Sequence, residues 1–186
     1  AGMAKTQQQN ERLTRVGPGT PMGELLRRYW HPVSVAAELD ANPVRRIRLL
    51  GEDLTLYRST AGTYGLVGDV CPHRCTSLEY GIPDARGLRC AYHGWLFDEA
   101  GRCLEQPFDD RVNPAARFRD KITIAAYPVR ELGGLLFAYA GPAPAPLLPR
   151  WDLLVRADLM RAVDIHTIPC NWLQCMDNSV DPVHFE

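Results

Sequence analysis

Two short segments of this sequence each combine one cysteine with one histidine. The first is Cys71-Pro72-His73, and the second is Cys90-Ala91-Tyr92-His93. Thiolate sulfur and imidazole nitrogen are the side-chain ligands that zinc, iron and iron–sulfur clusters use in proteins. Each segment therefore offers one ligand of either kind within a tight turn, and we expect the four side chains to hold one metal group.

The mixed composition of each segment separates the kinds of metal group that four such ligands could hold. A [2Fe–2S] cluster in which two histidines replace two cysteines on one iron needs this set. Structural zinc is the alternative, but zinc sites usually draw both cysteines from one knuckle and both histidines from a helix. Unrelated buried cysteines and histidines would leave both mixed pairs unexplained. The spacing favours the cluster.

The other cysteines carry less information. Six cysteines in 186 residues are too few for a disulfide scaffold. Cys75 closes the first segment, and we expect it to be a buried packing thiol. The other three have no ligand spacing and are expected to be thiols of the core: Cys103, Cys170 and Cys175.

A second pattern stands near the end of the chain, in Asp181-Pro182-Val183-His184. A non-heme ferrous oxygenase site needs two histidines and one carboxylate on one face of the metal. His184 suits one of these ligands, and the remaining ones are absent from the sequence. The same residues also suit the start of a helix, with Asp181 as N-cap and Pro182 in the first turn. The residues alone leave both interpretations open.

The elements that must position these side chains follow from the hydrophobic pattern. Thr20-Pro21 predicts the start of a helix over residues 22–30, which His31-Pro32 ends because the residue before proline avoids helical backbone. From residue 44 the pattern changes to short strands divided by turns, which predicts an antiparallel β module. The strands are expected at residues 44–50, 54–57, 64–67, 122–129 and 135–139, and a buried helix at residues 172–176.

Proline marks the main boundary in the chain. Four prolines lie within residues 142–149 and predict an extended, semi-rigid connector. We therefore expect an N-terminal arm and helix over residues 1–43, a cluster-binding domain over 44–140, the connector over 141–149, and the beginning of another domain over 150–186. The chain stops without a helix-ending signal, so we expect it to continue beyond Glu186.

Composition excludes several classes of protein. The chain is 46% hydrophobic and 23% charged, as is usual for a globular domain. Its 21 basic and 22 acidic residues leave a net charge of −1, so bulk charge attracts neither nucleic acid nor an anionic membrane. The sequence has no spanning apolar run and no apolar segment of a secretory signal. We expect a cytoplasmic protein without a membrane or nucleic-acid partner.

The sequence C-P-H-R-C-T-S-L-E-Y-G, followed by G-L-R-C-A-Y-H-G-W-L-F-D, resembles the cluster-binding region of Rieske non-heme iron ring-hydroxylating oxygenases. The likeness is to the phthalate dioxygenase and vanillate O-demethylase type, and it extends from the N-terminal helix to the end of the chain. It implies a β-rich α+β fold, in which a Rieske [2Fe–2S] domain of three small antiparallel sheets precedes an α+β catalytic domain. Only the start of that catalytic domain is present.

The resemblance also implies a role for each site residue. Cys71 and Cys90 would hold the iron that stays ferric, and His73 and His93 would hold the redox-active iron. His184 would be the first ligand of a mononuclear iron. Asp181 would link a cluster histidine of one subunit to an iron histidine of the next, in a head-to-tail homotrimer.

By the same resemblance, the protein would be the terminal oxygenase component of its system. Electrons from NADH would arrive through a separate flavin and iron–sulfur reductase. With O2 they would drive hydroxylation or O-demethylation of a small aromatic compound. A Rieske-type ferredoxin without its own catalytic iron is the alternative, but it leaves the N-terminal helix, the connector and the Asp181–His184 pattern unexplained. A binding module stapled by zinc is the third possibility.

Two positions depart from the respiratory Rieske proteins. Those proteins have a second pair of cysteines that forms a disulfide over the cluster, and one of these cysteines stands where this chain has Tyr92. They also have a serine hydroxyl close to a cluster sulfur where this chain has Trp95. Fewer hydrogen bonds to sulfur stabilise the reduced cluster less. The sequence therefore predicts a low reduction potential.

Overall fold

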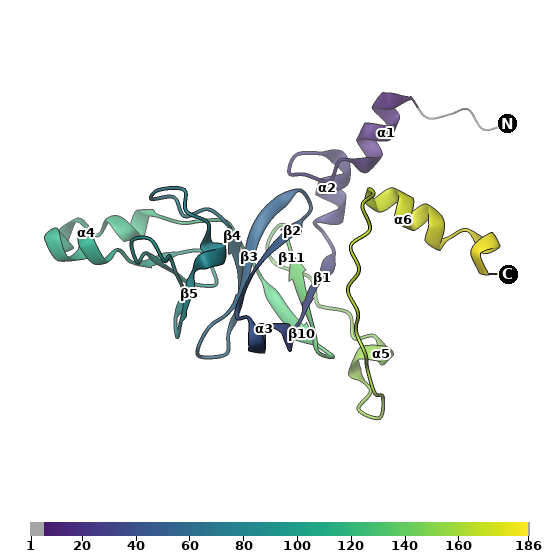
Figure 1. Cartoon of the computed structure of the whole chain (residues 1–186). Helices are drawn as coiled ribbons and strands as arrows, with labels where there is room; N and C mark the ends of the chain where they lie inside the picture. The colour runs from purple at the N-terminus through teal and green to yellow at the C-terminus, as the bar shows by residue number, and fades with distance from the viewer. Residues whose placement is uncertain (1–5, 186) are drawn as a thin grey trace.

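The strands of the protein form three small antiparallel sheets in the computed structural model, which describes residues 6–185 (Figure 1). Their orders are β1-β11-β10, β2-β3-β4-β9 and β5-β6-β7-β8. This confirms the expected fold class. The strands are β1 (Trp30–Val35), β2 (Val44–Leu49), β3 (Glu52–Arg58), β4 (Tyr64–Gly68), β5 (Ile82–Asp84), β6 (Gly87–Arg89), β7 (Leu96–Phe97), β8 (Cys103–Glu105), β9 (Ala126–Tyr127), β10 (Val129–Leu132) and β11 (Leu135–Tyr139).

Short helices connect and flank the sheets. The α-helices of the described residues are α1 (Gln7–Thr14), α2 (Pro21–Leu26), α3 (Glu38–Ala41), α4 (Pro107–Val112), α5 (Asp152–Val155) and α6 (Trp172–Ser179). The 3₁₀ helices are η1 (Leu78–Tyr80), η2 (Pro114–Ala116), η3 (Phe118–Lys121) and η4 (Pro182–Phe185). None of the helices within residues 6–185 is long and apolar enough to cross a bilayer.

The N-terminal helix is shorter than the sequence pattern predicts. Thr20 caps α2 as expected, since its side chain accepts a hydrogen bond from the backbone N–H of Gly23. The helix ends at Leu26, however, and residues Trp30–Val35 form β1 beside β11. Pro32 is tolerated there because β1 is an edge strand. One side of an edge strand has no neighbouring strand, so a residue without a backbone N–H loses no hydrogen bond on that side. The expected helix end at residue 30 is therefore wrong.

The sheet β2-β3-β4-β9 is buried on both of its faces. Along β3, Leu54 and Leu56 belong to one core cluster and Tyr57 belongs to the other. Along β4, the neighbours Leu66 and Val67 are divided in the same way. Alternate residues of a strand point to opposite faces, so one central sheet serves two cores. One core also holds both candidate ligand cysteines, Cys71 and Cys90.

Leu66 provides a test of this central sheet. Its side chain is fully buried, so replacement by alanine removes buried methyl groups and leaves a cavity. We expect Leu66→Ala to lower the free energy of unfolding by about 2–5 kcal/mol, measured by denaturant titration. Leu147→Ala is the control, because Leu147 is 94% exposed. Equal stability of the two variants would contradict the two-sided core.

The hydrophobic pattern of the sequence did not predict the third sheet. Its strands β5, β6, β7 and β8 are two or three residues long, too short to display an alternation of apolar and polar residues. They pair in sequence order as a meander. The second Cys-His segment is the turn between β6 and β7, so this small sheet positions half of the candidate site.

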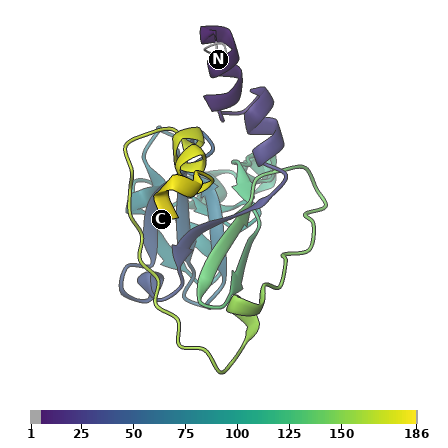
Figure 2. The ribbon, with the colours of Figure 1, turned by 90° about the vertical axis from the view of Figure 1, so that its right-hand side faces the viewer.

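The last part of the chain lies along the outside of the sheets (Figures 1 and 2). Residues 141–149 contain no helix or strand, as expected of a proline-rich connector, and the Trp30 indole donates to the Pro146 carbonyl at 2.9 Å. Helix α6 confirms the helix expected at residues 172–176, and its Trp172 indole donates to the Leu13 carbonyl at 3.0 Å. No residue of α6 is buried. The expectation of a buried helix is therefore wrong.

Candidate metal centre

The two Cys-His segments form loops with one backbone plan. In the first loop the N–H of Cys75 donates to the carbonyl of Cys71 at 3.0 Å, and the N–H of Cys71 donates to the carbonyl of Thr76 at 2.9 Å. In the second loop, residues 90, 94 and 95 repeat both bonds at 3.0 and 2.8 Å. Each loop thus opens with its cysteine and closes with a turn of the same size. The plan places a Cys and a His on each of two matching turns.

The closing residue of each loop has left-handed backbone. Gly94 has φ +77° and Cys75 has φ +55°. Glycine adopts this conformation without strain, whereas a residue with a Cβ does so at a cost. Cys75 is also exposed. The expectation that it is a buried packing thiol is therefore wrong, because the closing position of this turn turns its side chain to solvent.

The first loop is also tied to the central sheet. The buried carboxylate of Asp69 accepts hydrogen bonds from Thr55 of β3 at 2.7 Å and from Ser77 at 2.9 Å. The backbone N–H of Leu78 donates to the Asp69 carbonyl at 2.6 Å. These bonds fix both ends of the loop, since Asp69 precedes it and Ser77 follows it.

The four expected ligands come together between the loops. Cys71 and Cys90 are buried, at 1% and 2% exposure, and their thiols interact with each other. The rings of His73 and His93 lie edge to face with centroids 4.4 Å apart. The structure thus pairs thiol with thiol and imidazole with imidazole, although each pair comes from two different loops.

Burial and the neighbouring ligands shift the pKa values of two of these groups. Burial raises the pKa of the Cys71 thiol to about 11, and Cys90 adds to this, while the backbone N–H groups of His73 and Arg74 act in the opposite direction. Burial lowers the pKa of His73, and His93 and Arg74 lower it further. A lowered pKa keeps the His73 imidazole neutral, which is the form that binds a metal.

One orphaned atom tests whether a metal group fits. The Nδ1 atom of His73 is buried and has no hydrogen-bond partner among the described residues. A buried ring nitrogen without a partner is costly in a folded protein, and an iron ligated by this nitrogen would remove that cost. Zinc would need all four donors on one ion. The donors here form two pairs, thiol with thiol and ring with ring. The donors fit a [2Fe–2S] group.

Two aromatic rings cover the imidazoles. Trp95 is buried and stacks on His73 with centroids 4.6 Å apart and an interplanar angle of 3°. Tyr92 is 63% exposed and its ring lies 3.8 Å from that of His93. The sequence singled out these residues only for the groups they lack. Their packing on the histidines was not predicted, since C-x-x-H-G-W spacing carries no information on which ring faces which.

The environment of the loops predicts the reduction potential of a bound cluster. Neither Tyr92 nor Trp95 supplies the disulfide or the serine hydroxyl of the respiratory type, so fewer donors stabilise the reduced state. We expect a potential near the bottom of the Rieske range, ~−150 mV, with pH dependence only well above neutrality. Redox titration followed by visible absorption measures it. A value near ~+300 mV, at the top of that range, would contradict the prediction.

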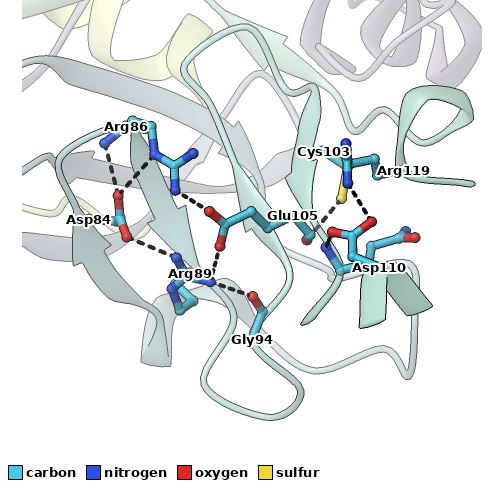
Figure 3. A network of polar contacts seen from close by, with 9 residues as sticks. Asp84, Arg86, Arg89, Gly94, Cys103, Glu105, Asp110 and Arg119 are labelled. Atoms are coloured by element: carbon cyan, nitrogen blue, oxygen red, sulfur yellow. Dashed lines mark hydrogen bonds and ion pairs between the residues drawn. The ribbon is translucent and has the colours of Figure 1, made fainter. Parts of the chain in front are cut away.

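A charged network supports the second loop from behind (Figure 3). The Arg89 guanidinium donates to the Gly94 carbonyl at 2.9 Å. It also pairs with the carboxylates of Asp84 at 2.9 Å and Glu105 at 2.8 Å. Arg86 contacts both carboxylates from the outer side. Arg89 precedes Cys90 directly, so this side chain closes the loop that carries His93. Nothing in the spacing of the ligands pointed to it.

Removing Arg89 should loosen this loop. The Arg89 hydrogen bond lowers the pKa of Asp84, and the Arg86 hydrogen bond lowers that of Glu105. Both carboxylates therefore stabilise the fold at neutral pH, and this contribution is lost as the pH falls through their lowered pKa values. We expect Arg89→Met to weaken cluster binding roughly tenfold, as is common for outer-shell partners, measured as the rate of bleaching of the visible absorption with a chelator present.

The matched control for Arg89 is Arg48→Met. Arg48 pairs with Asp53 on the edge strand β2 of another sheet. The control should retain the cluster as well as the wild-type protein. If Arg89→Met bleaches no faster than the control, the network does not support the ligand loop.

The C-terminal candidates lie far from these loops in the same chain. Sheet β5-β6-β7-β8 stands at one end of the molecule, and α6 and the C-terminal residues stand at the other (Figure 1). Asp181 accepts a hydrogen bond from the backbone N–H of Val183 at 3.1 Å, as a residue that starts a helix does, and η4 follows it. The side chain of His184 lies outside the described residues. The structure therefore does not bring Asp181 together with the cluster ligands of its own chain.

The three remaining cysteines divide in two. Cys103 is buried, which confirms the expected core thiol. Cys170 is exposed and Cys175 is partly exposed, so for these two the expectation is wrong. Their sulfur atoms lie 3.5 Å apart, on either side of Asn171, the N-cap of α6. Cys170 directly precedes the N-cap, and Cys175 follows it by four residues. The contact therefore packs the chain before the helix against the beginning of the helix.

Comparison with known proteins agrees with the geometry of the loops. The model of the family described as "Rieske [2Fe-2S] domain" matches residues 29–128. The match includes β1, both ligand loops and β9, and it stops before the proline-rich connector.

Two curated relatives are similar over nearly the whole chain. The 5,5'-dehydrodivanillate O-demethylase oxygenase subunit of Sphingobium sp. strain SYK-6 is 55% identical over 96% of this chain and 42% of its own length. The phthalate 4,5-dioxygenase oxygenase subunit of Pseudomonas putida is 39% identical over 96% of this chain and 41% of its own length. The chain thus spans less than half the length of these relatives.

Solved structures show the same fold. Dicamba monooxygenase, solved with non-heme iron and dicamba, is 29% identical, with a TM-score of 0.55 over 64% of this chain and 35% of its own. NdmA of Pseudomonas putida CBB5, solved with caffeine, is 30% identical, with a TM-score of 0.56 over 63% of this chain and 34% of its own.

Proposed function

The chain belongs to the Rieske [2Fe–2S] domain family, and on that premise we propose that it is the N-terminal part of the terminal oxygenase component of a Rieske non-heme iron oxygenase. In this proposal the chain has four parts. They are an N-terminal arm that includes β1 (residues 1–43), the cluster domain (44–140), the connector (141–149) and the beginning of the catalytic domain (150–186). The complete protein uses electrons from NADH, delivered in the cytoplasm by a separate flavin and iron–sulfur reductase.

The four loop side chains are the proposed cluster ligands. Cys71 and Cys90 hold one iron through sulfur, and His73 and His93 hold the other through ring nitrogen. The pairing of thiol with thiol and of ring with ring supports this division, as does the unpartnered Nδ1 of His73. When bound, the cluster accepts one electron at a time from the reductase and passes it on.

The protein around the cluster has three tasks in this proposal. The matching turns present the ligands, and the N–H groups of His73 and Arg74 face the Cys71 sulfur. Trp95 shields the His73 ring from water. Tyr92 packs on the ring of His93, and His93 is exposed, so an electron can enter or leave there. Arg89 keeps the second loop closed.

The observation that carries the proposal is the reach of the similarity. The Rieske model ends at residue 128, yet the O-demethylase subunit is 55% identical over 96% of the chain. The similarity therefore continues through the connector and into residues 150–186. A Rieske-type ferredoxin, the alternative function, would need none of that segment.

We propose that Asp181 and His184 serve the catalytic iron of the complete protein. His184 is the first iron ligand, and Asp181 is the bridge to a cluster histidine of a neighbouring subunit. The separation of these residues from their own cluster supports transfer between subunits (Figure 1), and a head-to-tail homotrimer provides it. A carboxylate that accepts imidazole N–H bonds on both sides orients both rings and shortens the electron path.

The proposed substrate is a small aromatic acid. Relatives named for O-demethylation and for ring dioxygenation are both similar to this chain. The higher identity belongs to the O-demethylase, which favours a methoxylated ring as substrate. Removal of the methyl group would consume one O2 and one NADH, and would release formaldehyde, water and a phenol.

The test is an assay of the complete protein with its reductase. Iron and acid-labile sulfide analysis establishes the cluster and excludes zinc. NADH-dependent release of formaldehyde from methoxylated aromatic acids then establishes O-demethylation, and a hydroxylated ring product would establish the dioxygenase or hydroxylase reaction instead. A protein that holds the cluster, exchanges electrons with the reductase and forms neither product would be the ferredoxin-type carrier.

A further inference from the structure

Gln106 is the most unusual buried polar residue near the candidate cluster. Its side chain is fully buried, at 0% exposure. Neither the Nε2 nor the Oε1 atom meets a partner with hydrogen-bond geometry among the described residues. A buried amide with both ends unpaired costs free energy that native proteins rarely leave uncompensated. The Cys103 thiol lies beside this amide, but a thiol is a weak hydrogen-bond partner, so the amide still lacks a strong one.

The backbone of Gln106, in contrast, is firmly held. Its N–H donates to the Asp110 carboxylate at 2.9 Å, and its carbonyl accepts from the Asp110 N–H at 2.8 Å. Asp110 is in turn paired with Arg119 (Figure 3). The chain reverses into α4 at this point, so the side chain is directed into the core by a fixed backbone. Chance placement of a mobile side chain does not account for its burial.

The surroundings of Gln106 locate the missing partner. Burial raises the pKa of the Cys103 thiol and the ligand Cys71 raises it further, while the Gln106 amide beside the thiol acts in the opposite direction. Cys103, Cys71 and Cys90 belong to one buried cluster. The next residue, Pro107, lies against the second ligand loop, since a Cβ added to Gly94 would come within 3.2 Å of its ring. Gln106 thus lies beside Cys103 in the core that holds both ligand cysteines, and its neighbour Pro107 lies against the loop that carries His93.

We propose that the side-chain N–H of Gln106 donates a hydrogen bond to a sulfur atom on the cysteine-ligated side of the [2Fe–2S] group. The inference rests on the proposed function, since it needs the cluster. Sulfur in the cluster carries negative charge, which increases on reduction, so an N–H donor stabilises the reduced form more than the oxidised form. Gln106 is neutral in both states and exchanges neither proton nor electron. It is a positioning residue that raises the potential.

A buried water is the competing partner for this amide. Water can satisfy an unpaired polar group in a protein core, and it would leave the cluster unaffected when Gln106 is replaced. The two explanations differ in one quantity, because only a hydrogen bond to the cluster changes its reduction potential and couples the amide nitrogen to its unpaired electron.

The test compares Gln106→Met with Tyr57→Phe in the complete, cluster-loaded protein. Methionine keeps the length of the side chain and removes the donor. Tyr57→Phe is the matched control, because the Tyr57 hydroxyl is also buried and unpartnered in the same core cluster, but Glu99 and Asp98 are the charges that affect it. We expect Gln106→Met to lower the equilibrium constant for reduction about tenfold, which is ~59 mV for one electron. The control should change it less than twofold.

A second measurement starts from the wild-type protein. With ¹⁵N in the glutamine side chains, pulsed magnetic resonance of the reduced wild-type cluster should show a weakly coupled amide nitrogen that Gln106→Met abolishes. Absence of that coupling, or an unshifted potential in Gln106→Met, would overturn the inference while the proposed function stands. Absence of acid-labile sulfide from the wild-type protein would overturn both. If the variant fails to hold a cluster, the wild-type nitrogen coupling decides the matter.

Discussion

Cys71→Ala is expected to abolish the visible absorption and the reduced-state magnetic resonance signal of the protein. Cys71 is buried at 1% exposure beside Cys90, and it is one of two thiols on the proposed first iron. Its loss leaves that iron with a single protein ligand in a core that admits little solvent. We therefore expect iron and acid-labile sulfide to fall to background in the purified variant.

The first loop contains its own control. Cys75→Ala removes a thiol four positions along the same turn, but this thiol is exposed and closes the loop on the solvent side. The variant should keep the full cluster, because alanine retains the same left-handed backbone without adding bulk. Loss of the cluster in both variants, or in neither, would contradict the ligand assignment.

His73→Cys tests whether the imidazole of His73 binds iron. A third thiolate in place of the imidazole should shift the absorption and magnetic resonance spectra toward those of all-thiolate clusters. Unchanged spectra would mean that the His73 nitrogen does not bind iron, and its unpartnered Nδ1 would then need another explanation. One zinc and no sulfide in the wild-type protein would overturn the central claim.

Asp181→Asn in the complete protein is expected to collapse product formation and to leave the cluster intact. Asparagine keeps the size of the side chain, but it removes the charge and half of the acceptor capacity. If Asp181 bridges two imidazoles across a subunit interface, asparagine cannot accept both N–H bonds with the same strength. The spectrum of the cluster and its reduction by the reductase should be normal, while single-turnover electron transfer to the iron should slow by orders of magnitude.

The alternative role of Asp181 predicts a different result. Asp181 accepts a hydrogen bond from Val183 at the start of η4, and asparagine caps a helix about as well as aspartate does. A residue that only starts a helix would therefore allow near-normal turnover in the variant. Asp177→Asn, in the exposed helix α6, controls for the loss of one negative charge nearby. Equal turnover in both variants would remove Asp181 from the mechanism.

The sequence predicted which residues would bind the cluster, because ligand chemistry depends on residue type and on short spacing. Cys71, His73, Cys90 and His93 were predicted in this way, and the structure brings all four together. The main strands were also predictable, since β2, β3, β4 and β11 are short runs rich in aliphatic, β-branched and aromatic residues that turn residues divide. The capping of α2 by Thr20 followed from two adjacent residues.

Only the tertiary structure decided the features that depend on contacts between distant segments. Strand β1 begins at Trp30, the last residue of the predicted helix, because β11 offers it a partner, and the short strands β5 to β8 pair with one another in sequence order. Cys75 is exposed because of the turn it closes. Arg89 and Gln106 acquired their roles from Gly94, Glu105 and Cys103. A pattern of residue types records local preference and burial, whereas the direction of a side chain in a core depends on which segments pack around it.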